Sequence, residues 1–102
     1  MVITTDRRNS AAAQTRAAVD EVLRIAQANR GRATVAGGSK PHVTLTCSVT
    51  DYSDGYFRAM LSGIEYATRG HFAPGAQAIG GMVWTLRSRL IDVSVRASKE
   101  NT

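Results

Sequence analysis

Residues 42–49 alternate polar and apolar side chains over their whole length. Successive side chains of a β-strand point to opposite faces of a sheet, so this alternation predicts a strand with one buried and one polar face. The apolar positions are Val43, Leu45, Cys47 and Val49. Such a strand requires an apolar layer on one side only, and the rest of the chain has to supply it.

Residues 90–96 alternate in the same way, with apolar side chains at Ile91, Val93 and Val95. We expect the segments around Cys47 and Val93 to lie side by side in a single sheet. Residues 72–88 contain a Gly-Gly pair next to a strand-like Val-Trp-Thr-Leu run. Each glycine costs a helix about 1 kcal/mol, so a strand with a glycine bulge is the better prediction there. Residues 87–89 then form the connection of a hairpin.

Two amphipathic helices are predicted, over residues 10–30 and 56–69. Apolar residues recur at helical spacing in both, and they are Val19, Val22, Leu23 and Ala26 in the first and Phe57, Met60, Leu61 and Ile64 in the second. We expect Asn9 or Ser10 to cap the first helix, an acid in the turn at residues 50–55 to cap the second, and glycines to end both. Residues 31–41 are expected to be a turn-rich connection.

These elements predict one α+β domain over residues 1–102, a mixed sheet with two helices packed on one face. Three predicted strands are barely enough for independent stability, and exposed sheet edges need covering, so we expect oligomerisation.

Composition excludes several classes of protein. No apolar run approaches the ~18 residues of a membrane span, and residues 1–10 have no apolar core of a secretory signal, so we expect a cytoplasmic protein. A single cysteine excludes an internal disulfide and a cysteine-based zinc site within the chain. The net charge is +5, with 13 Lys and Arg against 8 Asp and Glu spread along the chain. This indicates a solvated, basic surface, with attraction of phosphates or small carboxylates as the alternative.

Several local strings, in this order, resemble the RidA family, also called YjgF or L-PSP endoribonuclease-like. The resemblance runs from about residue 11 to residue 97. The strings are AQTRAAVDEVL at residues 13–23, HVTLTCSVTD at 42–51, the helix at 57–66, FAP at 72–74 and LIDVSV at 90–95.

The resemblance implies a chorismate-mutase-like fold and a homotrimer that binds a small molecule in clefts at the subunit interfaces. It also implies hydrolysis of reactive enamines and imines derived from 2-amino acids, by addition of water, without a metal or organic cofactor. Some family members are instead described as ribonucleases or translation inhibitors. The family begins with two strands before its first helix, and this sequence begins about where they end, so we expect an N-terminally shortened domain.

Two family positions are replaced. Ala76 stands where the family has an arginine that binds the substrate carboxylate, and Ser94 stands where it has a glutamate thought to position the water. An alanine cannot anchor a carboxylate, and a serine is a poor general base without an activating partner. Asp92 matches the first glutamate of the family's closing strand.

The candidate substrate-binding residues are Gln77, Arg89, Asp92 and Ser94, and no catalytic residue is assigned. Arg87 and Arg89 are candidates to replace the missing cation. The two histidines are too far apart in sequence to indicate a metal site. The alternatives are a non-catalytic small-molecule-binding trimer and an RNA-binding, endoribonuclease-like translation inhibitor. RNA ranks lower because no pattern of interleaved aromatic and basic residues is present.

Overall fold

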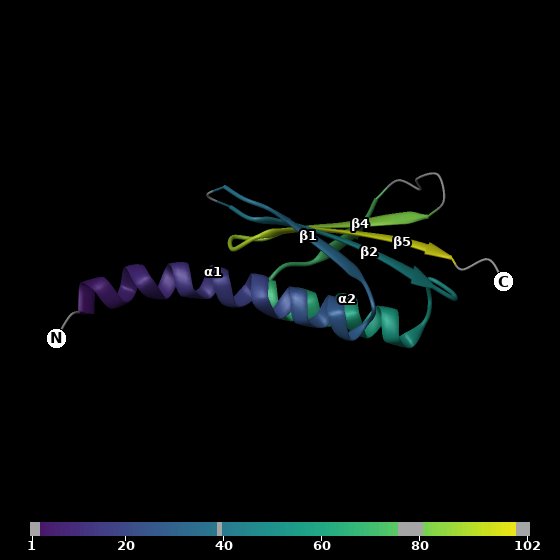
Figure 1. The fold of residues 1–102 in the computed structure, drawn as a ribbon, viewed down its shortest axis with the longest axis horizontal. Helices are drawn as coiled ribbons and strands as arrows, with labels where there is room; N and C mark the ends of the chain where they lie inside the picture. Colours follow the sequence, from purple (N-terminus) through teal and green to yellow (C-terminus); the bar gives the residue numbers. More distant parts are fainter. Residues whose placement is uncertain (1–2, 39, 76–80, 100–102) are drawn as a thin grey trace.

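The computed structural model describes residues 3–38, 40–75 and 81–99, and in them it forms a layer of two helices against a five-stranded mixed sheet (Figure 1). This confirms the α+β class. The elements are α1 (Ile3–Ala28), β1 (Arg32–Ala36), β2 (His42–Val49), α2 (Gly55–Thr68), β3 (Phe72–Pro74), β4 (Met82–Arg87) and β5 (Asp92–Lys99).

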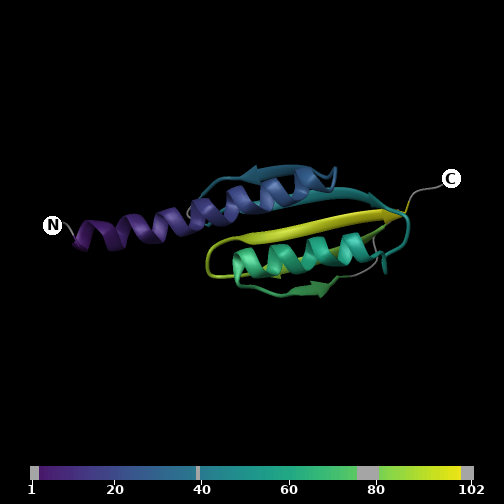
Figure 2. The ribbon, with the colours of Figure 1, turned by 90° about the horizontal axis from the view of Figure 1, so that it is seen from below.

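The strand order in the sheet is β1-β2-β5-β4-β3. The two central strands β2 and β5 run parallel, with Val43 opposite Val93 and Cys47 opposite Ala97, whereas the outer pairs are antiparallel. The predicted pairing of the two alternating segments is therefore confirmed. α1 and α2 lie side by side along the same face of the sheet, as expected (Figure 2).

The core fills the space between the two layers. All four apolar positions of β2 are buried, as are the four predicted core positions of α2. In α1, Val22 and Ala26 are buried, and Val19 and Leu23 pack against the core while partly exposed. The alternation in the sequence thus corresponds to the two faces of the sheet.

Two strands lie where the sequence did not predict them. Residues 31–41 were expected to be a connection, but Arg32–Ala36 pairs with β2 as an edge strand. The region predicted as one strand with a glycine bulge contains two, β3 and β4, and the glycine at position 80 lies outside the described residues. Both additional strands are short edge strands. They gain backbone hydrogen bonds from a neighbour and bury few side chains, so they leave little hydrophobic pattern.

α1 begins at Ile3, about two turns before the predicted start, and its N-terminal part runs past the end of the sheet (Figures 1 and 2). It ends close to the predicted stop, where Arg30 adopts a left-handed conformation and the Gly31 N–H donates to the Ala26 carbonyl at 2.8 Å. Within the described residues, no helix combines the length and the hydropathy that a bilayer crossing demands.

The start of α2 confirms the predicted capping acid. The Asp54 carboxylate accepts hydrogen bonds from the backbone N–H groups of Tyr56 and Phe57 at 2.8 and 3.2 Å. These bonds satisfy two of the amide groups that have no partner within the helix. At the other end the left-handed residue is Arg69 rather than the glycine that follows it.

Candidate functional site

The helices cover one face of the sheet and leave the other open (Figure 1), and on the central strands this open face is polar. On the two central strands it carries polar side chains only, namely His42, Thr44, Thr46 and Ser48 on β2 and Asp92, Ser94, Arg96 and Ser98 on β5. Aligned polar side chains on neighbouring strands lie close enough to interact with one another or with one ligand. This open face is therefore where the fold places its chemistry.

Strand register places an acid between two basic groups. Asp92 on β5 lies opposite His42 on β2 and opposite Arg87 on β4. In the next row, Ser94 lies opposite Thr44 and Thr85. The two rows are two residues apart along each strand, a distance of about 6.6 Å, so a small molecule can contact both rows at once.

A hydrogen bond joins the two rows. His42 Nε2 lies 2.9 Å from Ser94 Oγ, and the imidazole tautomer decides which of the two groups donates. The bond holds the hydroxyl at a defined position on an exposed part of the sheet. It also supplies the partner that the sequence did not show for Ser94.

The Asp92 carboxylate is only partly satisfied. Its Oδ1 lies 3.1 Å from Lys40 Nζ, yet this buried oxygen accepts no hydrogen bond from the described residues. The contact with Lys40 is thus an ion pair without hydrogen-bond alignment. A buried oxygen without a hydrogen-bond donor costs about 1–3 kcal/mol. The Asp92 side chain is 30% exposed, so its carboxylate can still accept a hydrogen bond from a ligand or a water molecule through its accessible part.

These groups line a hollow of about 380 Å³ beside β4 and β5. Its lining consists of Lys40, His42, Thr85, Leu86, Arg87, Asp92, Val93 and Ser94. Two permanent cations against one carboxylate give it a net positive charge. Its volume lies in the range of sites for small metabolites and is too small for a folded partner.

The sequence-predicted site residues divide into three groups. Asp92 and Ser94 come together in the hollow, with Arg87 beside them. Arg89 is exposed in the turn between β4 and β5 and is not part of the lining. Gln77 lies outside the described residues, as does Ala76.

Sequence reasoning missed Lys40 and gave His42 no role in a site. His42 occupies a polar position of an alternating segment, as does Ser94, so their presence on one face was predictable. Their contact was not, because it depends on the parallel pairing of β2 and β5 and on its register.

Cys47 is a core residue and not a nucleophile. Burial raises the pKa of its thiol, and its Sγ lies 3.9 Å from the Arg96 carbonyl. Because only the thiolate reacts readily, we expect Cys47 in the folded protein to react with a disulfide reagent at least tenfold more slowly than in urea-unfolded chain at the same pH. Thiol release followed by absorbance measures both rates. Equal rates would contradict the buried placement.

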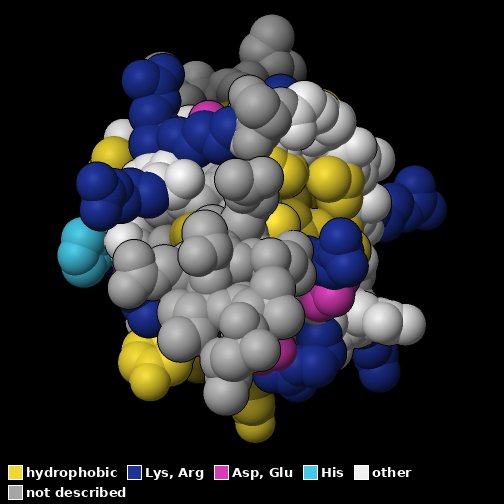
Figure 3. All heavy atoms as spheres, turned by 90° about the vertical axis from the view of Figure 1, so that its left-hand side faces the viewer, with side chains coloured by type: hydrophobic (Ala, Val, Ile, Leu, Met, Phe, Trp, Pro, Cys, Tyr) yellow, Lys and Arg dark blue, Asp and Glu magenta, His cyan; other side chains and the backbone are white. Residues whose placement is uncertain are grey.

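Positive charge is not confined to the hollow. Figure 3 shows Lys and Arg side chains spread around the end of the molecule toward which the N-terminal part of α1 points. In the part of the chain that the structure describes, no three His, Cys, Asp or Glu side chains gather closely enough to hold a metal ion. Comparison of the chain with protein-family models, curated proteins and solved structures gives no match in any of the three.

Proposed function

We propose that this chain is a RidA-like protein with a chorismate-mutase-like fold, and that the hollow on its open sheet face binds a small carboxylate-bearing imine. The observation that carries the proposal is the Asp92 oxygen without a hydrogen-bond donor, in a hollow that also holds cations. The helix and strand order and the mixed sheet are consistent with the family resemblance. The RidA-like assembly is a cytoplasmic homotrimer with the ligand at a subunit interface.

Recognition of the ligand carboxylate falls to Arg87 and Lys40. A guanidinium binds a carboxylate through two parallel hydrogen bonds, and Arg87 lies one strand away from Asp92. It thereby takes over the role that the family gives to the arginine replaced by Ala76. The hydroxyls of Ser94 and Thr85 offer further hydrogen bonds to a polar ligand.

The chemistry is addition of water to the imine carbon. The Asp92 carboxylate accepts a proton from the water, whose oxygen forms a bond to that carbon while the C=N π electrons move to nitrogen. Asp92 gives this proton to the nitrogen, which completes the carbinolamine. The hydroxyl proton of the carbinolamine then passes to the amine through Asp92, the C–N bond breaks with release of ammonia, and the C=O bond of a 2-oxo acid forms. His42 orients the Ser94 hydroxyl, which holds the water in place. No metal or organic cofactor enters this scheme.

Binding is tested by titrating 2-oxobutyrate, a stable product analogue, into the protein while recording amide NMR shifts. We expect Arg87→Ala to weaken binding roughly 10- to 100-fold, because a charge-assisted hydrogen bond is worth about 1.5–3 kcal/mol. Arg89→Ala is the matched control, since it removes the same side chain from the same hairpin outside the hollow. Equal effects of the two variants would contradict the assignment of the site.

Catalysis is tested separately. A pyridoxal-phosphate dehydratase acting on serine releases the imine, and semicarbazide traps it. We expect the protein to shorten the lifetime of the imine and Asp92→Asn to abolish this effect. Binding without any change in lifetime would leave a non-catalytic small-molecule-binding trimer.

RNA binding is the second candidate. It is favoured because three arginines, Arg32, Arg87 and Arg96, lie on the open face. Contacts with phosphates weaken steeply as salt rises. Salt-sensitive retention of RNA on a filter, together with no binding of 2-oxobutyrate, would select RNA over the small-molecule site.

A further inference from the structure

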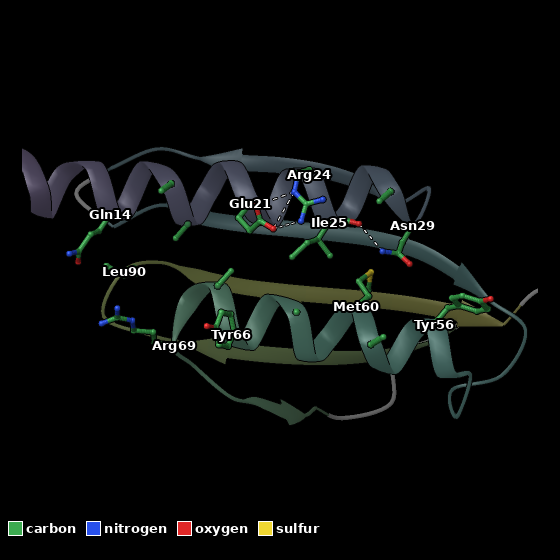
Figure 4. Close-up of a pocket in the computed structure, with 16 residues that line it drawn as sticks. Gln14, Glu21, Arg24, Ile25, Asn29, Tyr56, Met60, Tyr66, Arg69 and Leu90 are labelled. Atoms are coloured by element: carbon green, nitrogen blue, oxygen red, sulfur yellow. Dashed lines mark hydrogen bonds and ion pairs between the residues drawn. The ribbon is translucent and has the colours of Figure 1, made fainter.

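A second concave site lies on the helix layer, on the opposite side of the molecule from the hollow. It is a groove of about 760 Å³ between α1 and α2 (Figure 4). Small and apolar side chains make up most of its lining, including Ala17, Ala18, Ile25, Ala28, Ala59, Met60, Gly63 and Ala67. Small side chains keep the walls of a groove low, which allows another helix to approach closely.

Two aromatic side chains border this groove from α2. Tyr56 near the start of the helix is 84% exposed, and Tyr66 near its end is 90% exposed. Both belong to the lining, and Figure 4 shows them well separated along α2. Exposed tyrosines beside an apolar groove are typical anchors of a protein interface.

The charge inside the groove is balanced on the α1 side. Arg24 Nε donates to Glu21 Oε2 at 3.1 Å, and the bond lowers the pKa of the Glu21 carboxyl. Figure 4 shows this pair on the α1 wall. A second chain of the same positive net charge therefore meets a neutral wall on the α1 side, and among the described residues Arg69 is the one further charged residue of the lining.

α1 is longer than its own sheet needs. It has 26 residues, a length of about 39 Å, and among its described side chains Ala18 is the first that is buried. The N-terminal part of α1 projects beyond the sheet (Figures 1 and 2). An isolated helix of only about 12–15 residues is marginal in water, so the projecting part of α1 gains stability from a packing partner.

We propose that the partner is a second copy of this chain, and that two α1 helices pack antiparallel about a twofold axis near residues 15 and 16. In this arrangement residue 3 lies opposite residue 28 of the second copy, and residue 14 opposite residue 17. The projecting residues 3–14 of each copy lie along the groove of the other, beside residues 17–28. Both projecting segments and both grooves are then used once, as a closed twofold dimer requires.

The length of the groove supports this pairing. α2, which forms its second wall, has 14 residues and spans about 21 Å. The projecting twelve residues span about 18 Å, so they fill the groove without extending past it. The dimer uses the helix layer and leaves the open sheet face free, so it is independent of the proposed function.

The first test is the mass of the full chain measured by light scattering. A helix-layer dimer of the 10.9 kDa chain has a mass of about 22 kDa, or about 65 kDa if sheet faces also form trimers. We expect Ala59→Arg, which places a long charged side chain in the groove, to halve the measured mass. Ser62→Arg is the matched control, because Ser62 is exposed on the same helix and outside the groove.

A second test does not depend on the arginine variants folding. Ala17→Cys places a thiol close to the proposed axis, while the native Cys47 is buried. We expect a short bismaleimide to convert Ala17→Cys into a covalent dimer, and to leave Ser62→Cys and the parent chain unlinked.

Each contrary outcome overturns the proposal. A parent mass of one or three chains excludes a twofold dimer. An unchanged mass in folded Ala59→Arg shows that the groove is not the dimer interface. Absence of the covalent dimer of Ala17→Cys excludes a twofold axis near residues 15 and 16. A parent that is monomeric but binds an added amphipathic helix through Ala59 would show that the groove serves a different protein.

Discussion

Replacing Trp84 with alanine is expected to lower the free energy of unfolding by about 3–5 kcal/mol. The side chain is 5% exposed and lies on the helix-facing side of β4. Its ring packs edge-on against Phe57 with centroids 5.1 Å apart, and against Tyr52 at 5.8 Å. Its removal therefore loses both buried area and two aromatic contacts, and leaves a cavity between the layers.

Urea unfolding followed by circular dichroism measures this loss as a lower midpoint. The control is His71→Ala, which removes a ring whose side chain is 96% exposed, and it should change stability by less than about 0.5 kcal/mol. A loss below 1 kcal/mol for Trp84→Ala would show that this ring does not link the helix layer to the sheet.

Replacing Gly81 with alanine is expected to cost about 3 kcal/mol, although it adds only one methyl group. A Cβ at this position would lie 2.2 Å from the Ala97 carbonyl oxygen and 3.2 Å from Ser98 Cα. Both obstacles are backbone atoms of β5, so no change of rotamer relieves them. Either β4 separates from β5 at this end of the sheet, or the pairing register of the two strands shifts.

Gly55→Ala is the matched control for this substitution. No atom lies within 4 Å of a Cβ at that position, and Gly55 is the first residue of α2. Alanine restricts the unfolded chain there without a clash, so we expect a gain of roughly 0.5–1 kcal/mol. Thermal unfolding of both variants checks the opposite signs, and two shifts of the same sign would contradict the close approach at Gly81.

The candidate site was only half predictable. Asp92 and Ser94 were identified as polar positions of the last strand, and both line the hollow. Arg89 was identified as a cation in the predicted hairpin connection, and it is exposed in the turn between β4 and β5 and is not part of the lining. Lys40 was missed because its role depends on a carboxylate 52 residues later in the chain.

By itself, the sequence determined the elements with strong internal periodicity. The alternation at residues 42–49 and in the segment that contains β5, and the helical spacing in α1 and α2, follow from the requirement that each element bury one face. That requirement acts locally, so it leaves a pattern within a dozen residues. It was sufficient for the fold class and for the adjacency of β2 and β5.

Only the tertiary structure decided what depends on neighbours distant in the chain. The edge strands β1 and β3 exist because adjacent strands supply hydrogen bonds, not because their own side chains demand burial. The contact between His42 and Ser94 follows from a parallel register, and the groove follows from how closely α1 and α2 approach at Gly63. Pairing direction, register and helix spacing are properties of two segments together, so neither segment encodes them alone.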